Sequence, residues 1–242
     1  YRAFWHTVRN ARRWVVISGW QFDSDARLLR GDDAKDADMP VELLPFLDGM
    51  CRSKPRLRIW MLAWDYSLVD ALERERMQRW LFDQSSSERL RFRFDEQHPV
   101  GASHHQKFVV VDGYHTFLGG MDLCANRWDD REHRAVDGRR RDPHDRPYAP
   151  YHDVQAYLAG RQVAQALTEL FHERWKTATG ETLELPDTPE PPAPRAFEPS
   201  HPLPPGPVAL SQTRGRMLAP PRDAVEQIRL LYEDAIASGE RL

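Results

Sequence analysis

The sequence predicts an α/β fold in which helices flank a mixed, largely parallel sheet. Short apolar runs at residues 14–20, 57–64 and 108–111 have the length and composition of buried strands. Between such runs lie stretches with the periodicity of amphipathic helices. Strands that alternate with helices of about ten to fifteen residues are typical of β–α–β units, which place parallel strands in one sheet.

The first half of the chain contains most of these alternating elements. Phe4 and Val8, with Ala11 or Trp5, form an apolar stripe at helical spacing. Pro40 suits the first turn of a helix, and Ser67 suits an N-cap. In chain order we expect a helix at 1–13, a strand at 14–20, an acidic loop at 23–38, a helix at 40–51, a strand at 57–64, a helix at 67–82 and a strand at 90–94.

The second half combines further strands with two long irregular stretches. Asp112-Gly113 follows the run at 108–111 and is a hairpin signal. The proline-dense segment at 181–207 predicts a stiff, extended linker. We expect a long charged loop at 127–151, a strand at 153–159, a helix at 160–179, a strand at 208–212 and a helix at 222–238.

Charge and cysteine content exclude several classes of protein. The 242-residue chain has a net charge of −3, so no overall basic field favours nucleic acid, and no nucleic-acid partner is expected. The basic run at 139–141 lies between Asp137 and Asp142, which predicts a solvated loop. Cys51 and Cys124 are far apart, which argues against a disulfide framework or a zinc ribbon. No apolar run approaches the roughly 20 residues needed to span a bilayer.

The stretch from Gly101 to Asp112 contains the residues with the clearest chemical potential. A polar cluster leads directly into the apolar strand, and His105 and Lys107 are two residues apart. Because strand residues alternate between faces, both side chains should project to the same side. An imidazole beside a fixed cation can attack a phosphoryl group and hold its negative oxygens.

These residues resemble the signature of the phospholipase D superfamily. The pattern is His105-x-Lys107, then Asp112 after four residues, then Gly119-Gly120. The longer string His-His-Gln-Lys-Phe-Val-Val-Val-Asp, with Gly-Gly-Met-Asp-Leu, Arg-Trp-Asp and Tyr-His-Asp-Val-Gln after it, resembles the eukaryotic-like type. The resemblance implies a phospholipase D-like fold and a phosphodiesterase or phosphatidyltransferase that acts on glycerophospholipids.

The resemblance also implies roles for individual residues. His105 would attack phosphorus and form a phosphohistidine, while Lys107 would bind the phosphate oxygens. Asp153 would hold the far nitrogen of that imidazole. The remaining implied site residues are Gly119 and Gly120, which would let backbone approach closely, and Asp122 and Asn126, which would line the site.

Several nearby residues have a structural alternative. Asp112 belongs to the signature and is a catalytic candidate, but a hydrogen bond to its own turn is the stronger expectation. His104 and His152 are expected to be structural. A metal site built from His104, His105, His115 and His133 lacks a known ligand spacing, so no metal or cofactor is predicted, although calcium is possible because it assists some plant relatives.

The sequence contains one His-x-Lys pair, whereas a full family member has two repeats, each with its own pair. Residues 228–241 repeat the helix-then-basic layout of residues 1–13. We therefore expect a catalytic repeat at 1–180, a linker at 181–207 and the start of a second, truncated repeat at 208–242. Because the chain starts at Tyr1 without Met or a signal-like segment, its N-terminus is expected to be trimmed.

The expected partners are a missing C-terminal half that carries the second motif and a phospholipid substrate at a membrane surface. Localisation is expected to be soluble or peripheral to a membrane, without further assignment. Two alternatives stay open: a nuclease-type phosphodiesterase in which two chains pair, and a non-catalytic module that binds lipid or a partner.

Overall fold

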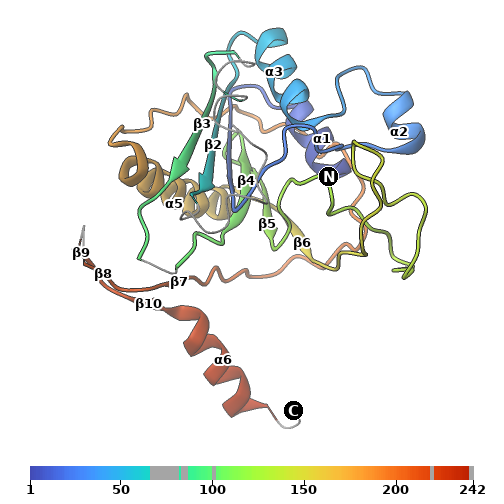
Figure 1. Ribbon diagram of the computed structural model, residues 1–242. Helices are drawn as coiled ribbons and strands as arrows, with labels where there is room; N and C mark the ends of the chain where they lie inside the picture. Colours follow the sequence, from blue (N-terminus) through green and yellow to red (C-terminus); the bar gives the residue numbers. More distant parts are fainter. Residues whose placement is uncertain (66–81, 83–86, 100–101, 219–220, 240–242) are drawn as a thin grey trace.

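A computed structural model describes residues 1–65, 82, 87–99, 102–218 and 221–239. The helix predicted at 67–82 lies, apart from residue 82, outside the described residues. Three layers make up the main body: helices α1 and α3, the sheet, and helix α5 (Figure 1). The helices are α1 (Arg2–Arg9), α2 (Gly31–Lys35), α3 (Leu43–Ser53), α5 (Arg161–Thr179) and α6 (Gln227–Ser238).

The six-stranded sheet is mixed, as predicted. Its strands are β1 (Trp14–Gly19), β2 (Arg58–Trp64), β3 (Leu90–Asp95), β4 (Lys107–Val111), β5 (His115–Gly119) and β6 (Gln155–Ala159). They lie in the order β3-β2-β1-β4-β5-β6; β1, β2 and β3 are parallel, and β4, β5 and β6 pair antiparallel. The end of β1 therefore lies beside the start of β4, which brings the predicted motif to the centre of the sheet.

Both faces of the sheet are buried, which explains the continuous apolar runs in β1, β2 and β4. On one face, Val15 and Ile17 pack with residues of α1 and α3, such as Val8 and Leu47. On the other face, Val16 and the remaining alternate residues pack against α5. A strand at the middle of three layers needs apolar side chains in both directions, so alternation with polar residues is absent there.

The connection between β4 and β5 is the predicted hairpin. Asp112 and Gly113 both have positive φ, at 49° and 61°, and the amide of Tyr114 donates to the carbonyl of Val111 at 3.1 Å. Two left-handed residues at the centre of such a turn match the twist of the paired strands.

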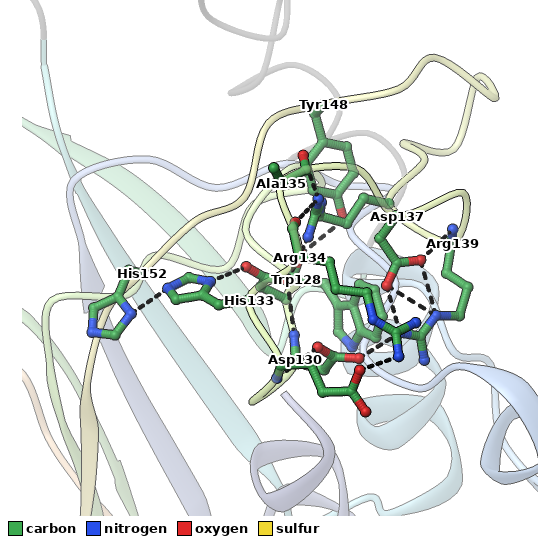
Figure 2. A network of polar contacts seen from close by, with 12 residues as sticks. Trp128, Asp130, His133, Arg134, Ala135, Asp137, Arg139, Tyr148 and His152 are labelled. Carbon is green, nitrogen blue, oxygen red and sulfur yellow. Dashed lines mark hydrogen bonds and ion pairs between the residues drawn. The ribbon is translucent and has the colours of Figure 1, made fainter.

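The long loop between β5 and β6 is tied down by charged contacts (Figure 2). Arg140 is 1% exposed and donates to Asp129 Oδ1 at 2.8 Å and to the carbonyl of Ala135 at 2.9 Å. The guanidinium groups of Arg30 and Arg139 lie 5.1 and 5.4 Å from the ring centre of Trp128. The predicted solvated loop is therefore wrong for Arg140, whose two terminal NH groups donate to neighbouring carbonyls and a carboxylate, while its buried Nε has no partner among the described residues.

The chain beyond α5 begins with an extended strap along the body, as the prolines predict. Phe197 packs on Phe117 and Tyr157, and the carbonyl of Ala193 lies 2.8 Å from His115 Nε2. Residues 208–212 form no strand, contrary to the prediction. The strand pairs that follow have two residues in each strand: β7 (Thr213–Arg214) with β10 (Val225–Glu226), and β8 (Met217–Leu218) with β9 (Pro221–Arg222).

Helix α6 extends away from the main body (Figure 1). It begins at Gln227 instead of the predicted residue 222, because the preceding residues form the short strand pairs. Its apolar side chains are uncovered: Leu230 is 51% exposed, Tyr232 65% and Ile236 58%. Among the described residues, no helix combines the length and the apolar character needed to cross a membrane.

Candidate active site

The structure brings His105 and Lys107 together at one end of the two central strands, where β1 ends and β4 begins. His105 precedes β4 instead of lying on it, so strand alternation does not set its direction. Both residues nevertheless face Trp20: the His105 ring lies 6.0 Å from the indole ring centre, and Lys107 Nζ lies 5.9 Å from it. The Lys107 ammonium also donates to the carbonyl of His105 at 3.1 Å.

Lys107 is held by a buried carboxylate. Its side chain is 4% exposed, and Nζ lies 3.4 Å from Asp122 Oδ2. Asp122 is itself fixed because its Oδ1 accepts from the backbone amides of Trp20 at 2.7 Å and Gln21 at 3.3 Å. Predicted as a substrate-binding residue, Asp122 is placed where it orients the cation.

The environment favours an uncharged His105. Burial, and then the positive charge of Lys107, lower the pKa of His105, while Asp122 and Asp153 oppose this shift. Burial likewise lowers the pKa of Lys107 against the pull of Asp122, and burial raises the pKa of Asp122 despite Lys107. A neutral imidazole has the free lone pair that a nucleophile needs.

Asp153 lies close to this group because two glycines leave room for it. A methyl group on Gly120 would lie 2.2 Å from Asp153 Oδ1, and one on Gly119 would lie 2.2 Å from the carbonyl oxygen of Val154. The Asp153 carboxylate also accepts from the amide of Val154 at 2.7 Å. No hydrogen bond joins Asp153 to His105 in the described part of the chain; its carboxylate acts on that imidazole through space.

A buried network of hydrogen bonds around Arg174 holds the residues that adjoin His105 and Lys107 in place. Arg174 of α5 donates to Asp95 Oδ2 at 3.0 Å, to Ser18 Oγ at 2.6 Å and to Gln106 Oε1 at 3.2 Å. His104 Nε2 lies 3.2 Å from the same Asp95 oxygen, which assigns His104 to the scaffold. Burial acts to raise the pKa of Asp95, but His104 and Arg174 outweigh it and the pKa is lowered.

Two predicted site residues lie elsewhere. Asn126 is exposed, and its Oδ1 accepts from Arg127 at 2.6 Å; no described contact connects it with His105 or Lys107. Asp112 lies beyond the opposite end of β4 from Lys107. Its buried carboxylate accepts from the backbone amides of Arg12, Arg13 and Trp14 at 2.7, 2.8 and 2.9 Å, which secures the connection between α1 and β1.

Comparison with known proteins places this site in a family. The Phospholipase D family model matches residues 7–196, which is well over half of the chain. The chain belongs to the phospholipase D family. The match includes His105, Lys107, Asp122 and Asp153, so the site built above lies inside the family's domain.

Relatives of this phospholipase D family chain are much longer than it is. Phospholipase D C of Dictyostelium discoideum is 25% identical over 203 residues, which are 74% of this chain and 12% of that protein. Phospholipase D beta 2 of Arabidopsis thaliana is 27% identical over 214 residues, covering 72% of this chain and 22% of the relative. The chain thus matches between about one eighth and about one fifth of the length of these relatives.

The solved structures that resemble this phospholipase D family chain include NucT and Nuc. NucT from Helicobacter pylori aligns with a TM-score of 0.44 and 12% identity, covering 72% of this chain and 86% of NucT. Nuc from Salmonella typhimurium, described as a phospholipase D family member, aligns with a TM-score of 0.42 and 10% identity, covering 72% and 84%.

The position of Asp112 predicts that this signature residue of the phospholipase D family acts on stability here. Asp112→Ala would leave three backbone donors without their charged acceptor, and we expect the free energy of unfolding to fall by about 2–4 kcal/mol. Asp112→Asn retains one side-chain oxygen and tolerates positive φ, so its loss should be smaller. Urea denaturation of both variants measures the difference. Equal stability of Asp112→Ala and the wild type would contradict this role.

The positive charge of Lys107 is predicted to lower the pKa of His105. Lys107→Met removes a cation that disfavours imidazolium, so the pKa of His105 should rise. An NMR titration of the His105 ring protons measures this change, and Lys35→Met, at an exposed helix residue, is the control. A pKa that stays unchanged or falls in Lys107→Met would contradict the described electrostatics.

Proposed function

We propose that this chain supplies one half of a phosphodiesterase that cleaves glycerophospholipids through a phosphohistidine on His105. The observation that carries the proposal is the position of His105, whose pKa is lowered by burial, beside a buried, carboxylate-bound Lys107, inside a domain of the phospholipase D family. An uncharged nucleophile next to a fixed cation suits attack on an anionic phosphodiester, because the cation offsets charge that develops on the phosphate oxygens.

The proposed first step uses this chain's own side chains. A ring nitrogen of His105 attacks phosphorus, and the bond between phosphorus and the head-group oxygen breaks. Lys107 binds the non-bridging oxygens as a point charge, held by Asp122. Asp153 stabilises the positive charge that develops on the imidazole when the nitrogen–phosphorus bond forms.

The leaving alcohol needs a proton, which we assign to a histidine of a second His-x-Lys motif. That histidine would then remove a proton from water or another alcohol, which attacks phosphorus and releases the lipid phosphate from His105. General acid–base help of this kind contributes about 10²–10⁴-fold. In the chain alone, water must supply the proton to the leaving alcohol, so we propose that the phosphohistidine forms slowly and that turnover is poor.

The uncovered face of α6 supports a second repeat as the partner. Leu230, Leu231 and Ile236 are each more than half exposed. Residues 228–241 also repeat the helix-then-basic layout of residues 1–13. In the first repeat the equivalent helix, α1, buries Phe4, Trp5 and Val8 against the sheet. We propose that a second repeat covers α6 in the same manner.

Phospholipid is favoured over nucleic acid as the substrate. The chain carries a net charge of −3, whereas a nuclease gains affinity from basic groups that follow the phosphate backbone. At the site the aromatic rings of Trp20 and Trp64 stack with centres 5.5 Å apart, and the main charged groups are Lys107, Asp122 and Asp153. A protein that binds lipid without cleaving it would have no need of a histidine with a lowered pKa beside a buried lysine.

A paired assay tests the proposal. The chain is incubated with phosphatidylcholine and ethanol, and separately with single-stranded DNA, each with and without a segment that carries a second His-x-Lys motif. We expect phosphatidylethanol when both parts are present and little without the second part. Cleavage of DNA by a dimer of this chain would favour the nuclease, and absence of both reactions with both parts present would favour a binding module.

A further inference from the structure

A second charged site lies at the starts of β1, β2 and β3, at the opposite end of these strands from His105. Four arginines line a hollow of about 540 Å³: Arg13 directly precedes β1, Arg58 begins β2, Arg89 directly precedes β3, and Arg56 lies in the turn before β2. Lys107 lies beside the other end of β1. Because β1 has six residues, the two places are about 20 Å apart.

The charges in this hollow are unbalanced. Glu184 is the acidic residue of the lining, and it forms no ion pair with any of the four arginines within the described chain. The neighbouring Arg91, in contrast, pairs with Glu181 at 2.7 Å. Four guanidinium groups at one place on a chain of net charge −3 repel one another unless an anion lies between them.

Two of the arginines that line the hollow have a buried donor without an acceptor among the described residues. Arg89 donates from Nη2 to the carbonyl of Cys51 at 2.6 Å, but its Nε and that of Arg13 are buried with no partner in the part of the chain that the structure describes. An adjoining hollow of about 210 Å³ shares Arg58 and Arg89 and is also lined by Trp60, Glu88 and Arg91. The buried indole Nε1 of Trp60 has no partner among the described residues. Buried donors of this kind are costly unless a ligand or water accepts from them.

We propose that this hollow, with Arg13, Arg56, Arg58 and Arg89, binds a phosphate-bearing anion separately from the catalytic site. Guanidinium groups match phosphate oxygens by paired, parallel hydrogen bonds, and several arginines around one volume suit a ligand with two or more negative charges. The volume exceeds that of a single phosphate, and Leu185 and Pro186 of the strap offer an apolar wall for the rest of the ligand. The ligand is a phosphorylated small molecule or the phosphate of an anionic lipid.

Arg56→Ala combined with Arg58→Ala tests this site, because both side chains are exposed and neither forms an ion pair within the described residues. Binding of inorganic pyrophosphate is measured by isothermal titration calorimetry, and binding of phosphatidic acid vesicles by flotation. Each lost charged hydrogen bond weakens binding by about tenfold or more, so the double variant should lose at least that factor. Arg141→Ala with Arg146→Ala, two exposed arginines of the long loop, is the matched control.

Pyrophosphate and phosphatidic acid vesicles distinguish a soluble phosphorylated ligand from a lipid head group. Loss of pyrophosphate binding in the double variant supports a soluble ligand, and loss of vesicle binding alone supports a lipid head group. The comparison is repeated in a Lys107→Met background, which removes the phosphate-binding cation of the catalytic site, and there the double variant should lose binding by the same factor. Failure of the wild type to bind either ligand, equal losses in the matched control, or no loss from the double variant in the Lys107→Met background would overturn the proposal.

Discussion

His105→Ala is expected to reduce phosphodiester turnover by at least about 10⁴-fold when the chain is combined with a second His-x-Lys segment. The variant removes the nitrogen that would bond to phosphorus, and alanine offers no replacement. Lys107, held by Asp122, stays in place and can still bind the phosphate, so the apparent affinity for substrate should change far less than kcat. A steady-state assay of phosphatidylethanol formation at several lipid concentrations separates the two effects.

His144→Ala is the matched control for this loss, because His144 is 69% exposed on the long loop and lies outside the site. Its turnover should equal that of the wild type. Turnover of His105→Ala within tenfold of the wild type would remove His105 from the proposed mechanism and require another nucleophile.

Arg174→Met is expected to lower the free energy of unfolding by about 3–5 kcal/mol. The substitution keeps much of the side-chain volume but leaves Asp95, which is 1% exposed, without its main cation. Chemical denaturation measures the change, and Arg161→Met, on the exposed side of the same helix α5, should have a small effect.

The double variant Arg174→Met with Asp95→Asn makes this interpretation specific. Removing both charges avoids an uncompensated buried carboxylate, so much of the lost stability should return. If the double variant were as unstable as the sum of the two single variants, packing would explain the loss and the buried ion pair would not.

The sequence was sufficient to predict the mixed sheet and most of its elements. The apolar runs of β1, β2 and β4 are recognisable in the sequence because both faces of these strands are buried. The prediction failed at residues 208–212, where most of the chain is exposed and no strand among the described residues pairs with it. The short helix α2 was missed because it buries no residue and so leaves no apolar periodicity.

The candidate site was only partly predictable. The spacing of His105 and Lys107 is local, and the structure brings the pair together at Trp20. The ion pair between Lys107 and Asp122 depends on how β1, β4 and the following loop meet in space. The contact of Arg174 with Asp95 joins residues 79 positions apart, and no local sequence pattern predicts such a pair.

The most direct test of the proposed mechanism is to locate the covalent intermediate. The chain is exposed to a short-chain phosphatidylcholine, denatured rapidly at neutral pH, digested and sequenced by tandem mass spectrometry. We expect the phosphatidyl group on the His105 imidazole, and it should accumulate most when the second His-x-Lys segment is left out. A phosphatidyl group on a different residue, or lipid turnover without any covalent adduct, would contradict the assignment of His105 as the nucleophile.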